Sequence, residues 1–399
     1  MDSSWRIVPA VLLGALAIAG AGRAADYNYP KKPLWYQTSA AVQALRTPPA
    51  WNNMAELFAK ELYSTDPLVG FSMERYINSP AGAALIELLE PVILFKDEMG
   101  PDLLAYWKKK GITKIMVHAE DAENRYAVYV PDAVLADRGG ARYPLMLLYS
   151  GGRDPIFTTE AFGIAAYGAK AGYITVAPTN RSPEAAARII EELSARYPVD
   201  STRVYGTGNG NGAFASFNVY AHNPRLFAAV SPFGISLRLS AVTLTKQELE
   251  RNFSGAGIQL PTQILDGARN SKRWHPLILK NEATQDYDPW LTLNGAVFNT
   301  VSNASGVTLA VYSADPAKRL TGIDFNYTWK RSLEDQYYFG EFRDRRGVPI
   351  FRTGIADQAS HWHSASYPQL IWEFCSMFSR DPTTGAVLYM PPAARAARR

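Results

Sequence analysis

The segment most able to carry chemistry is a glycine-dense turn between a predicted strand and a predicted helix. Residues 203–207 are predicted as the strand, residues 208–212 (Gly-Asn-Gly-Asn-Gly) as the turn, and residues 213–220 as a helix rich in small side chains. This is the pattern of a nucleophile elbow, Gly-x-Ser-x-Gly, whose sharp turn exposes the attacking residue while the flanking glycines let strand and helix approach closely. Gly210 occupies the place of the serine. The sequence therefore predicts the turn without its attacking atom.

Several segments of the chain resemble the secreted α/β-hydrolase esterases that are grouped with polyhydroxyalkanoate depolymerases and feruloyl esterases. The resembling residues are Val204-Tyr205, Thr207-Gly208, Asn211-Gly212, Phe227-Ala228-Ala229, the strand Gly172–Pro178, and Ser360-His361-Trp362-His363 followed by Trp372-Glu373-Phe374. The resemblance covers roughly residues 125–380 and departs from the family at Gly210. It implies an α/β fold of the α/β-hydrolase type, a mainly parallel sheet flanked by helices, and an ancestral carboxylic-ester hydrolysis.

The resemblance also implies an oxyanion hole and a base. Ser150 and Gly151 follow the predicted strand Tyr143–Tyr149 and resemble the His-Gly turn that donates one oxyanion N–H, with Ser150 in place of the histidine. The Asn211 N–H is the expected second donor. In this family the nucleophile, the acid and the histidine follow one another along the chain. His361 is therefore the expected base, with His363 in reserve.

The acid that would orient the histidine has two candidates. Asp286 follows the predicted strand Pro276–Leu279 and is the favoured residue. Asp315 follows the predicted strand Val307–Tyr312 and is the alternative, and Asp288 is a weaker neighbour of the first.

Gly210 changes what such a site can do. A triad works because the base deprotonates a hydroxyl at the elbow while N–H groups stabilise the oxyanion, and glycine has no atom with which to attack. Three explanations stay open: a non-catalytic relative that binds a ligand, a hydrolase whose serine is substituted in this sequence, or other chemistry with water activated by His361 or with Thr207 as nucleophile. Thr207 is expected to lie in the strand and to point away from the turn.

Parts of the sequence also fit two functions of other classes. Gly208-x-Gly210-x-x-Ala213 satisfies the loose dinucleotide fingerprint of a nucleotide-binding oxidoreductase, but no acid lies about 20 residues further on at a second strand end. A protein that only binds is the other possibility, since aromatic residues make up 12% of the chain and could line a carbohydrate or aromatic-ester groove.

The elements around the turn alternate between strand and helix. The predicted strands lie at 115–118, 126–131, 143–149, 173–178, 203–207, 226–232, 276–279, 307–312 and 348–351, and the predicted helices at 183–197, 213–220, 289–303 and 367–378. Such short βαβ links build a parallel sheet covered by helices.

The chain is expected to divide into four parts. Residues 1–24 are predicted as a signal peptide, because Arg6 precedes an apolar run and the small residues Gly22 and Ala24 stand at −3 and −1 of a cut after Ala24. Residues 25–110 are predicted as an N-terminal helical extension, residues 111–380 as the α/β-hydrolase domain with an insertion at 237–274 that could form a lid, and residues 381–399 as a C-terminal tail. The expected location is secreted or periplasmic.

Composition and charge exclude several classes of partner. The net charge of +4 is small and shows no concentrated basic surface, so no nucleic-acid partner is expected. Cys375 is the only cysteine, so no intramolecular disulfide can form. Neither a phosphate-loop motif nor zinc-ligand spacing is present, so no cofactor and no metal is expected. The expected partner is a small ester or a polyester or polysaccharide ester, with no stable membrane anchor after signal cleavage.

Overall fold

The computed structural model describes residues 65–66, 71–72, 79–88, 99–150, 155–234, 242–267, 290–296, 327–356, 359 and 364–391. The strands are β1 (Thr65–Asp66), β2 (Phe71–Ser72), β3 (Ile112–Val117), β4 (Tyr126–Pro131), β5 (Tyr143–Tyr149), β6 (Ile174–Pro178), β7 (Val199–Gly208), β8 (Ala229–Val230), β9 (Thr262–Gly267), β10 (Tyr327–Ser332), β11 (Gln336–Arg343), β12 (Pro349–Ala356), β13 (Phe378–Arg380) and β14 (Val387–Tyr389). The helices are α6 (Pro80–Glu87), α8 (Pro101–Lys109), α9 (Asp132–Ala136), α10 (Pro155–Glu160), α11 (Ile164–Ala171), α12 (Pro183–Arg196), α13 (Asn211–His222), α14 (Lys246–Asn252), the 3-10 turn η4 (Ser254–Ala256) and α17 (Tyr367–Cys375).

The central feature is a 10-stranded sheet with the order β10-β11-β12-β9-β8-β7-β5-β6-β4-β3. Strands β6, β5, β7, β8, β9 and β12 are parallel, whereas β4 runs antiparallel to β6 and β3. From β3 to β12 this is the strand order of the α/β-hydrolase fold, which confirms the expected fold class. Strands β11 and β10 extend the sheet beyond β12 as an antiparallel pair.

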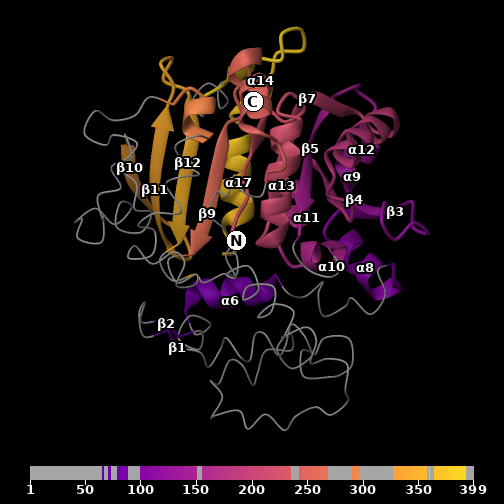
Figure 1. The fold of residues 1–399 in the computed structure, drawn as a ribbon. Helices are drawn as coiled ribbons and strands as arrows, with labels where there is room; N and C mark the ends of the chain where they lie inside the picture. Colours follow the sequence, from indigo (N-terminus) through magenta and orange to yellow (C-terminus); the bar gives the residue numbers. More distant parts are fainter. Residues whose placement is uncertain are drawn as a thin grey trace, which may run out of the picture.

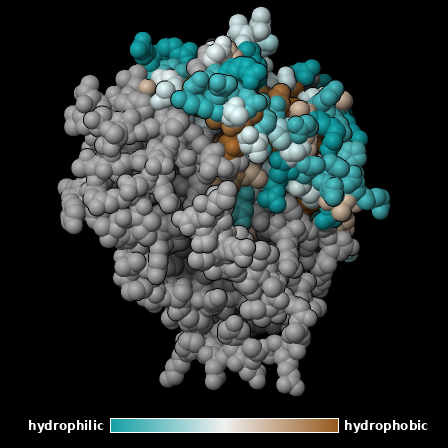
Figure 2. Space-filling view, viewed as in Figure 1, coloured by the Kyte–Doolittle hydropathy of each residue, from teal (hydrophilic) through white to brown (hydrophobic). Residues whose placement is uncertain are grey.

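Burial on both faces explains the composition of the central strands. Every residue of β5 after Tyr143 is buried, and every residue of β6 is buried. Helices α11 and α17 cover one face around Tyr173, Tyr205 and Trp372. Helices α12 and α13 cover the other face, where Phe217 packs on Trp290. The helix layers lie on either side of the sheet in Figure 1, and the described surface seen in Figure 2 is mainly hydrophilic.

The carboxyl ends of the parallel strands lie at one edge of the sheet, called here the carboxyl edge. Helix α6, from the N-terminal part of the chain, lies across the ends of β9 and β12 at this edge (Figure 1). Its residue Ala81 belongs to the buried core, and Leu88, directly after the helix, packs against Gly163. This part of the N-terminal extension therefore belongs to the same packed body as the sheet.

A buried ion pair joins the antiparallel end of the sheet to α10. Lys114 Nζ of β3 lies 2.7 Å from Glu160 Oε1, and both side chains are fully buried. The hydroxyl of Tyr129 on β4 donates to the same carboxylate over 2.5 Å. The pair fixes the helix that follows residues 151–154 of the chain.

The guanidinium of Arg380 connects the hairpin β13–β14 to several carbonyl groups of the chain. Arg380 is buried and donates to the carbonyl oxygens of Pro224 (2.6 Å), Phe227 (2.6 Å), Gln259 (2.7 Å) and Gly385 (3.0 Å). Burial, with a smaller contribution from Arg225, lowers the pKa of Arg380 to about 9. The four carbonyls stabilise the charge that burial disfavours.

The structure differs from the sequence-based expectations at specific elements. Residues 237–274 were expected as an insertion, but they contain α14 and β9, and β9 is a central strand of the sheet. The expected tail from residue 381 contains β14, which pairs with β13. The expected strand 226–232 is shorter, because only Ala229–Val230 forms β8. The predicted strands at 276–279 and 307–312 lie outside the described residues.

Candidate active site

The turn after β7 has the backbone conformation that an elbow requires. Gly210 has φ 53° and ψ −124° and immediately precedes the first residue of α13. Its N–H donates to the Phe233 carbonyl over 3.2 Å, and its own carbonyl accepts from Phe214 N over 3.2 Å. The N–H of the preceding Asn209 donates to the Tyr149 carbonyl over 2.9 Å. The end of β5 and Phe233, three residues after β8, therefore hold this turn through backbone hydrogen bonds.

The glycines on each side of Gly210 are required by close backbone contacts. A Cβ on Gly212 would lie 2.4 Å from the carbonyl carbon of Ser150, and a Cβ on Gly208 would lie 2.9 Å from the carbonyl oxygen of Tyr149. A Cβ on Gly206 would overlap the ring of Tyr220 at 2.4 Å. Strand, turn and helix can approach this closely only without side chains at these positions.

Two members of the predicted oxyanion hole, Asn211 and Ser150, lie within the described residues. Asn211 is the first residue of α13, and no acceptor for its N–H occurs among the residues that the structure describes. Such an N–H at a helix start is free to bind an oxygen, and the helix dipole favours negative charge there. Ser150 is buried, and its backbone lies against Gly212. Gly151, the third predicted member, lies outside the described residues.

The structure identifies a carboxylate that the sequence reasoning missed. Asp286, Asp288 and Asp315 all lie outside the described residues. Asp266, by contrast, is buried near the carboxyl end of β9, where its Oδ1 accepts from Gly267 N over 2.8 Å. Asp266 was missed because residues 237–274, which include β9, were expected to form an insertion. Strand β9 instead occupies the place in the sheet where the resemblance expects the strand before the acid.

The predicted histidines, His361 and His363, also lie outside the described residues. The neighbouring described segments are Pro349–Ala356, which is β12 and ends at the carboxyl edge, and the segment from Ser364 into α17. The base therefore stays a prediction.

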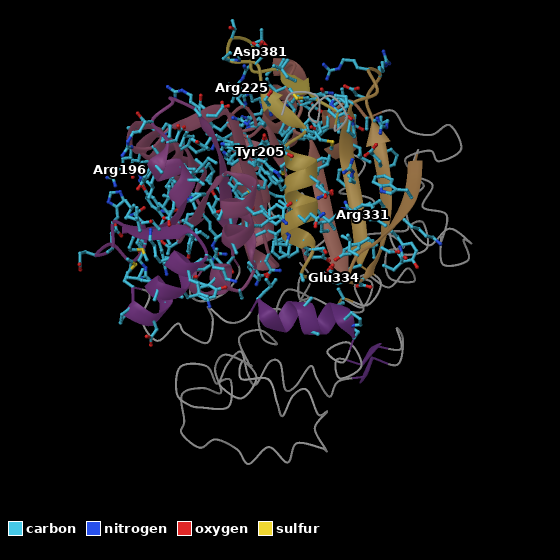
Figure 3. The ribbon with its side chains drawn as sticks, turned by 180° about the vertical axis from the view of Figure 1, so that it is seen from behind. Arg196, Tyr205, Arg225, Arg331, Glu334 and Asp381 are labelled. Atoms are coloured by element: carbon cyan, nitrogen blue, oxygen red, sulfur yellow. The ribbon has the colours of Figure 1, made fainter. Side chains whose placement is uncertain are left out.

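A carboxylate of the β10–β11 turn holds the start of α17. Glu334 accepts hydrogen bonds from Ser364 Oγ (2.6 Å), Ser366 N (2.9 Å), Ser366 Oγ and Tyr337 OH (2.7 Å). Burial alone would raise the pKa of Glu334, but these hydrogen bonds outweigh it and hold the pKa below its ordinary value. Figure 3 shows Glu334 at the end of the sheet nearest α6, which is the carboxyl edge.

Two alternative nucleophiles are buried away from the turn. The Thr207 hydroxyl is fully buried and donates to the Ser231 carbonyl over 2.7 Å, as expected for a strand residue. Cys375 is fully buried in α17, and burial raises the pKa of its thiol, which disfavours the reactive thiolate. Neither side chain is placed to attack a ligand at Gly210.

The described residues give no sign of a metal site or a membrane span. Within them, no group of His, Cys, Asp and Glu side chains could hold a metal ion. Their helices are also all too short or too polar to cross a bilayer.

No family model and no curated protein matches the sequence. Solved structures with a similar backbone include an acetyl xylan esterase from Aspergillus awamori, 14% identical over 66% of this chain and 98% of that chain, with a TM-score of 0.43. They also include a mutant of the feruloyl esterase module from Clostridium thermocellum, 11% identical over 66% of this chain and 86% of that one, with a TM-score of 0.39. An S-formylglutathione hydrolase from Agrobacterium tumefaciens is 14% identical over 43% and 84%, with a TM-score of 0.31. At these identities the similarity concerns the fold alone, and the fold of this chain is established by its own strand order.

Proposed function

We propose that this chain is an exported, ester-binding relative of the serine carboxylic-ester hydrolases in which the covalent step is absent. The observation that carries the proposal is Gly210, which has the elbow conformation and no side chain. The proposed ligands are small esters or the ester groups of a polyester or polysaccharide, the class to which the sequence resemblance points.

The elbow supports binding without acyl transfer. The oxyanion donors of such a site are backbone N–H groups, and they do not depend on a side chain at position 210. A carbonyl oxygen can therefore still accept a hydrogen bond from Asn211 N, while no hydroxyl is present to form an acyl intermediate. Loss of the nucleophile removes the covalent step and leaves binding and oxyanion stabilisation in place.

The close contacts of the neighbouring glycines also support an elbow whose backbone shape is kept. Gly206, Gly208 and Gly212 each lie where a Cβ would overlap a neighbouring group. Within residues 208–212, only position 210 departs from the Gly-x-Ser-x-Gly pattern. The positions that shape the turn keep the glycines that the packing requires.

The dinucleotide-binding alternative has weak support. The segment Gly208–Ala213 joins β7 to α13 in the interior of the sheet, and β7 is not the first strand. A nucleotide site of the fingerprint type belongs to the first strand and helix of its unit. We expect no change in melting temperature with NAD or NADP.

The proposal is tested by restoring a hydroxyl at the elbow. Gly210→Ser and Gly210→Ala are assayed beside the unmodified protein with p-nitrophenyl acetate and p-nitrophenyl butyrate. Both variants impose a similar backbone strain at φ 53°, about 1–3 kcal/mol, but only serine adds a nucleophile. We expect hydrolysis above the unmodified protein from Gly210→Ser alone, together with covalent labelling of that variant at position 210 by a fluorophosphonate.

Two results would contradict the proposal. Equal hydrolysis by all three proteins would mean that position 210 is not the nucleophile position. If the unmodified protein hydrolysed these esters as fast as Gly210→Ser, the missing hydroxyl at position 210 would not limit hydrolysis.

A further inference from the structure

Residues 357–363, which include both predicted histidines and are called here the histidine segment, are held at both ends by one tyrosine. Tyr337, at the start of β11, pairs through its backbone with Ala356, the last residue of β12 and the residue before the segment. Its side-chain hydroxyl is hydrogen-bonded over 2.5 Å to Oγ of Ser364, the residue after the segment. Within the segment, Ala359 is fully buried in the same core as the Tyr337 ring.

Glu334 completes this attachment from the turn before β11. Its carboxylate accepts from Tyr337 OH (2.7 Å) and from Ser364 Oγ (2.6 Å), so it binds both partners of the hydrogen bond at the end of the histidine segment. It also accepts from N and Oγ of Ser366, in the residues that lead into α17. One carboxylate therefore joins the hairpin β10–β11 to the residues that directly follow the segment.

Buried aromatic rings connect this carboxylate cluster to the elbow. The centroid of the Tyr337 ring lies 6.4 Å from that of Tyr367, and the centroid of the Tyr367 ring lies 5.6 Å from that of Phe233. All three side chains are fully buried. The carbonyl of Phe233 accepts from Gly210 N, so the last ring of this row belongs to a residue that holds the turn. Because close-packed interiors transmit displacements, the cluster and the elbow are parts of one rigid body.

A second ion pair joins the same hairpin to the same helix further from the histidine segment. Arg331 of β10 donates to both carboxylate oxygens of Glu373 on α17, and Gln369 donates to that carboxylate over 2.7 Å. Glu373 lies about two helical turns, or about 10 Å, beyond Ser366. In Figure 3, Arg331 lies further from α6 and the carboxyl edge than Glu334 does. The Glu373 pair therefore attaches the hairpin to the later part of α17.

We propose that Glu334 is a positioning residue of the ester site, which holds the histidine segment where an imidazole can act on a ligand at Gly210. This inference rests on the proposed function, because it takes the ester carbonyl to lie at the elbow and His361 to be the base. Glu334 acts through Ser364 and Ser366 and does not itself touch the ligand. Displacement of a reacting group by about 1 Å can lower a rate about a hundredfold, so a loosened segment should be visible in the chemistry.

The first test reads the histidine segment directly and needs no activity. The five histidines are labelled with 13C, and the imidazole signals of His361 and His363 are assigned from His361→Asn and His363→Asn. In Glu334→Gln at pH 7 both signals should shift, because the side chain that holds the end of the segment has lost its charge and one acceptor oxygen. The signals of His118 and His222, which bind residues of other elements, should not move.

The second test measures hydrolysis in the Gly210→Ser background. Adding Glu334→Gln should lower kcat for p-nitrophenyl acetate about tenfold, while KM stays within about twofold, because Asn211 N and the elbow are unchanged. Ser364→Ala removes one small hydroxyl of the cluster, so it should shift the same signals and lower kcat even if Glu334→Gln does not fold. Both changes act on one hydrogen-bonded unit, so the double variant should lose little more than Glu334→Gln alone.

Glu373→Gln is the matched control. It makes the same chemical change in the other attachment of the hairpin to α17. It should leave the signals of His361 and His363 in place, and in the Gly210→Ser background it should leave kcat unchanged. Circular dichroism at the assay temperature shows which variants are folded.

The outcomes separate this inference from the proposed function. Unmoved signals of His361 and His363 in Glu334→Gln and Ser364→Ala, or equal shifts in Glu373→Gln, would overturn the role of Glu334 while ester binding stands. A rise in KM with unchanged kcat would also overturn it, because the loss would then concern ligand binding. If the signals move as expected but Gly210→Ser does not hydrolyse the ester, Glu334 still holds the segment and the proposed ester site fails.

Discussion

The backbone of Gly212 lies directly against the backbone of Ser150, so closely that a Cβ on the glycine would lie 2.4 Å from the serine carbonyl carbon. This contact joins the first turn of α13 to the end of β5. It brings together the two segments that supply the proposed oxyanion donors. Residue 212 can approach residue 150 this closely only because it has no Cβ.

Gly212→Ala should destabilise the protein. Alanine is favoured over glycine inside a helix by about 1 kcal/mol, but here its Cβ would overlap backbone atoms that cannot rotate away. Overpacking of this kind costs about 1–3 kcal/mol or more, so the steric term decides the sign. We expect a lower urea midpoint, measured by circular dichroism.

The neighbouring variant Asn211→Ala is the control for Gly212→Ala. Asn211 is exposed, so this change should stay within about 0.5 kcal/mol of the unmodified protein. A Gly212→Ala protein as stable as the Asn211→Ala protein would show that the two segments can separate, and that the contact does not fix the donors.

Lys114→Met should be among the most destabilising single changes in the β3–β4 region. It would leave the Glu160 carboxylate fully buried without its cation, a loss of about 3–5 kcal/mol. Adding Glu160→Gln removes the uncompensated charge, so the double variant should be more stable than Lys114→Met alone. Thermal unfolding of the three proteins at pH 7 measures this difference.

An exposed pair provides the comparison for the buried one. Lys108 binds Asp132 over 2.8 Å with its side chain 68% exposed, so Lys108→Met should cost less than about 1 kcal/mol. If Lys108→Met and Lys114→Met lowered the free energy of unfolding by similar amounts, burial of the Lys114–Glu160 pair would have no energetic consequence.

Glu334→Gln should destabilise the protein at neutral pH and much less in acid. The folded-state pKa of Glu334 is depressed, so its contribution is present above its ordinary pKa and is lost as the pH falls through the folded value. Glutamine accepts fewer and weaker hydrogen bonds from Ser364, Ser366 and Tyr337. The expected loss is about 1–2 kcal/mol at pH 7, after allowance for partial exposure.

Urea midpoints from pH 7 to pH 3 measure this dependence. Glu184→Gln, which neutralises an exposed carboxylate of α12, removes the same charge and should show almost no loss. A difference between Glu334→Gln and the unmodified protein that is constant over this range would rule out a role for the ionised carboxylate.

Expression of the full chain in a bacterial host should give an exported protein that begins at Ala25. Signal peptidase cuts after small residues that follow an apolar run, and Ala24 satisfies that rule. Intact-mass measurement of the periplasmic fraction would show the loss of residues 1–24. A full-length mass in the cytoplasmic fraction alone would contradict export, and Ala24→Lys should block the cut if the site is right.

The sequence predicted those elements whose residues are buried uniformly. Tyr143–Tyr149 was predicted with the bounds that β5 has, because an unbroken apolar run is typical of a strand covered on both faces. The elbow was predicted because a sharp turn with close backbone contacts requires glycines, and their spacing can be read from the local sequence. Gly210 indeed has a positive φ, and Gly208 and Gly212 have no room for a side chain.

Strand β9 was missed because its polar side chains are satisfied by distant segments. Thr262 donates to Leu260 O and accepts from Trp290 Nε1, and Gln263 binds Ser231 Oγ and Leu370 O. These partners cannot be read from residues 262–267 alone, so the segment resembled a loop. The hairpin β10–β11 was missed although Trp329 stands between the polar residues Thr328 and Lys330, and its ring stacks on that of Phe339 across the strands with centroids 4.9 Å apart. That alternation was a usable signal.

Arg380 links the order of synthesis to the completion of the fold. The carbonyls of Pro224, Phe227 and Gln259 receive their donor from a residue more than a hundred positions later in the chain. During translation these carbonyl oxygens cannot accept hydrogen bonds from Arg380 until that residue has left the ribosome. A chain that must cross a membrane before it folds would gain time from this arrangement, because a contact that completes the interior is made late.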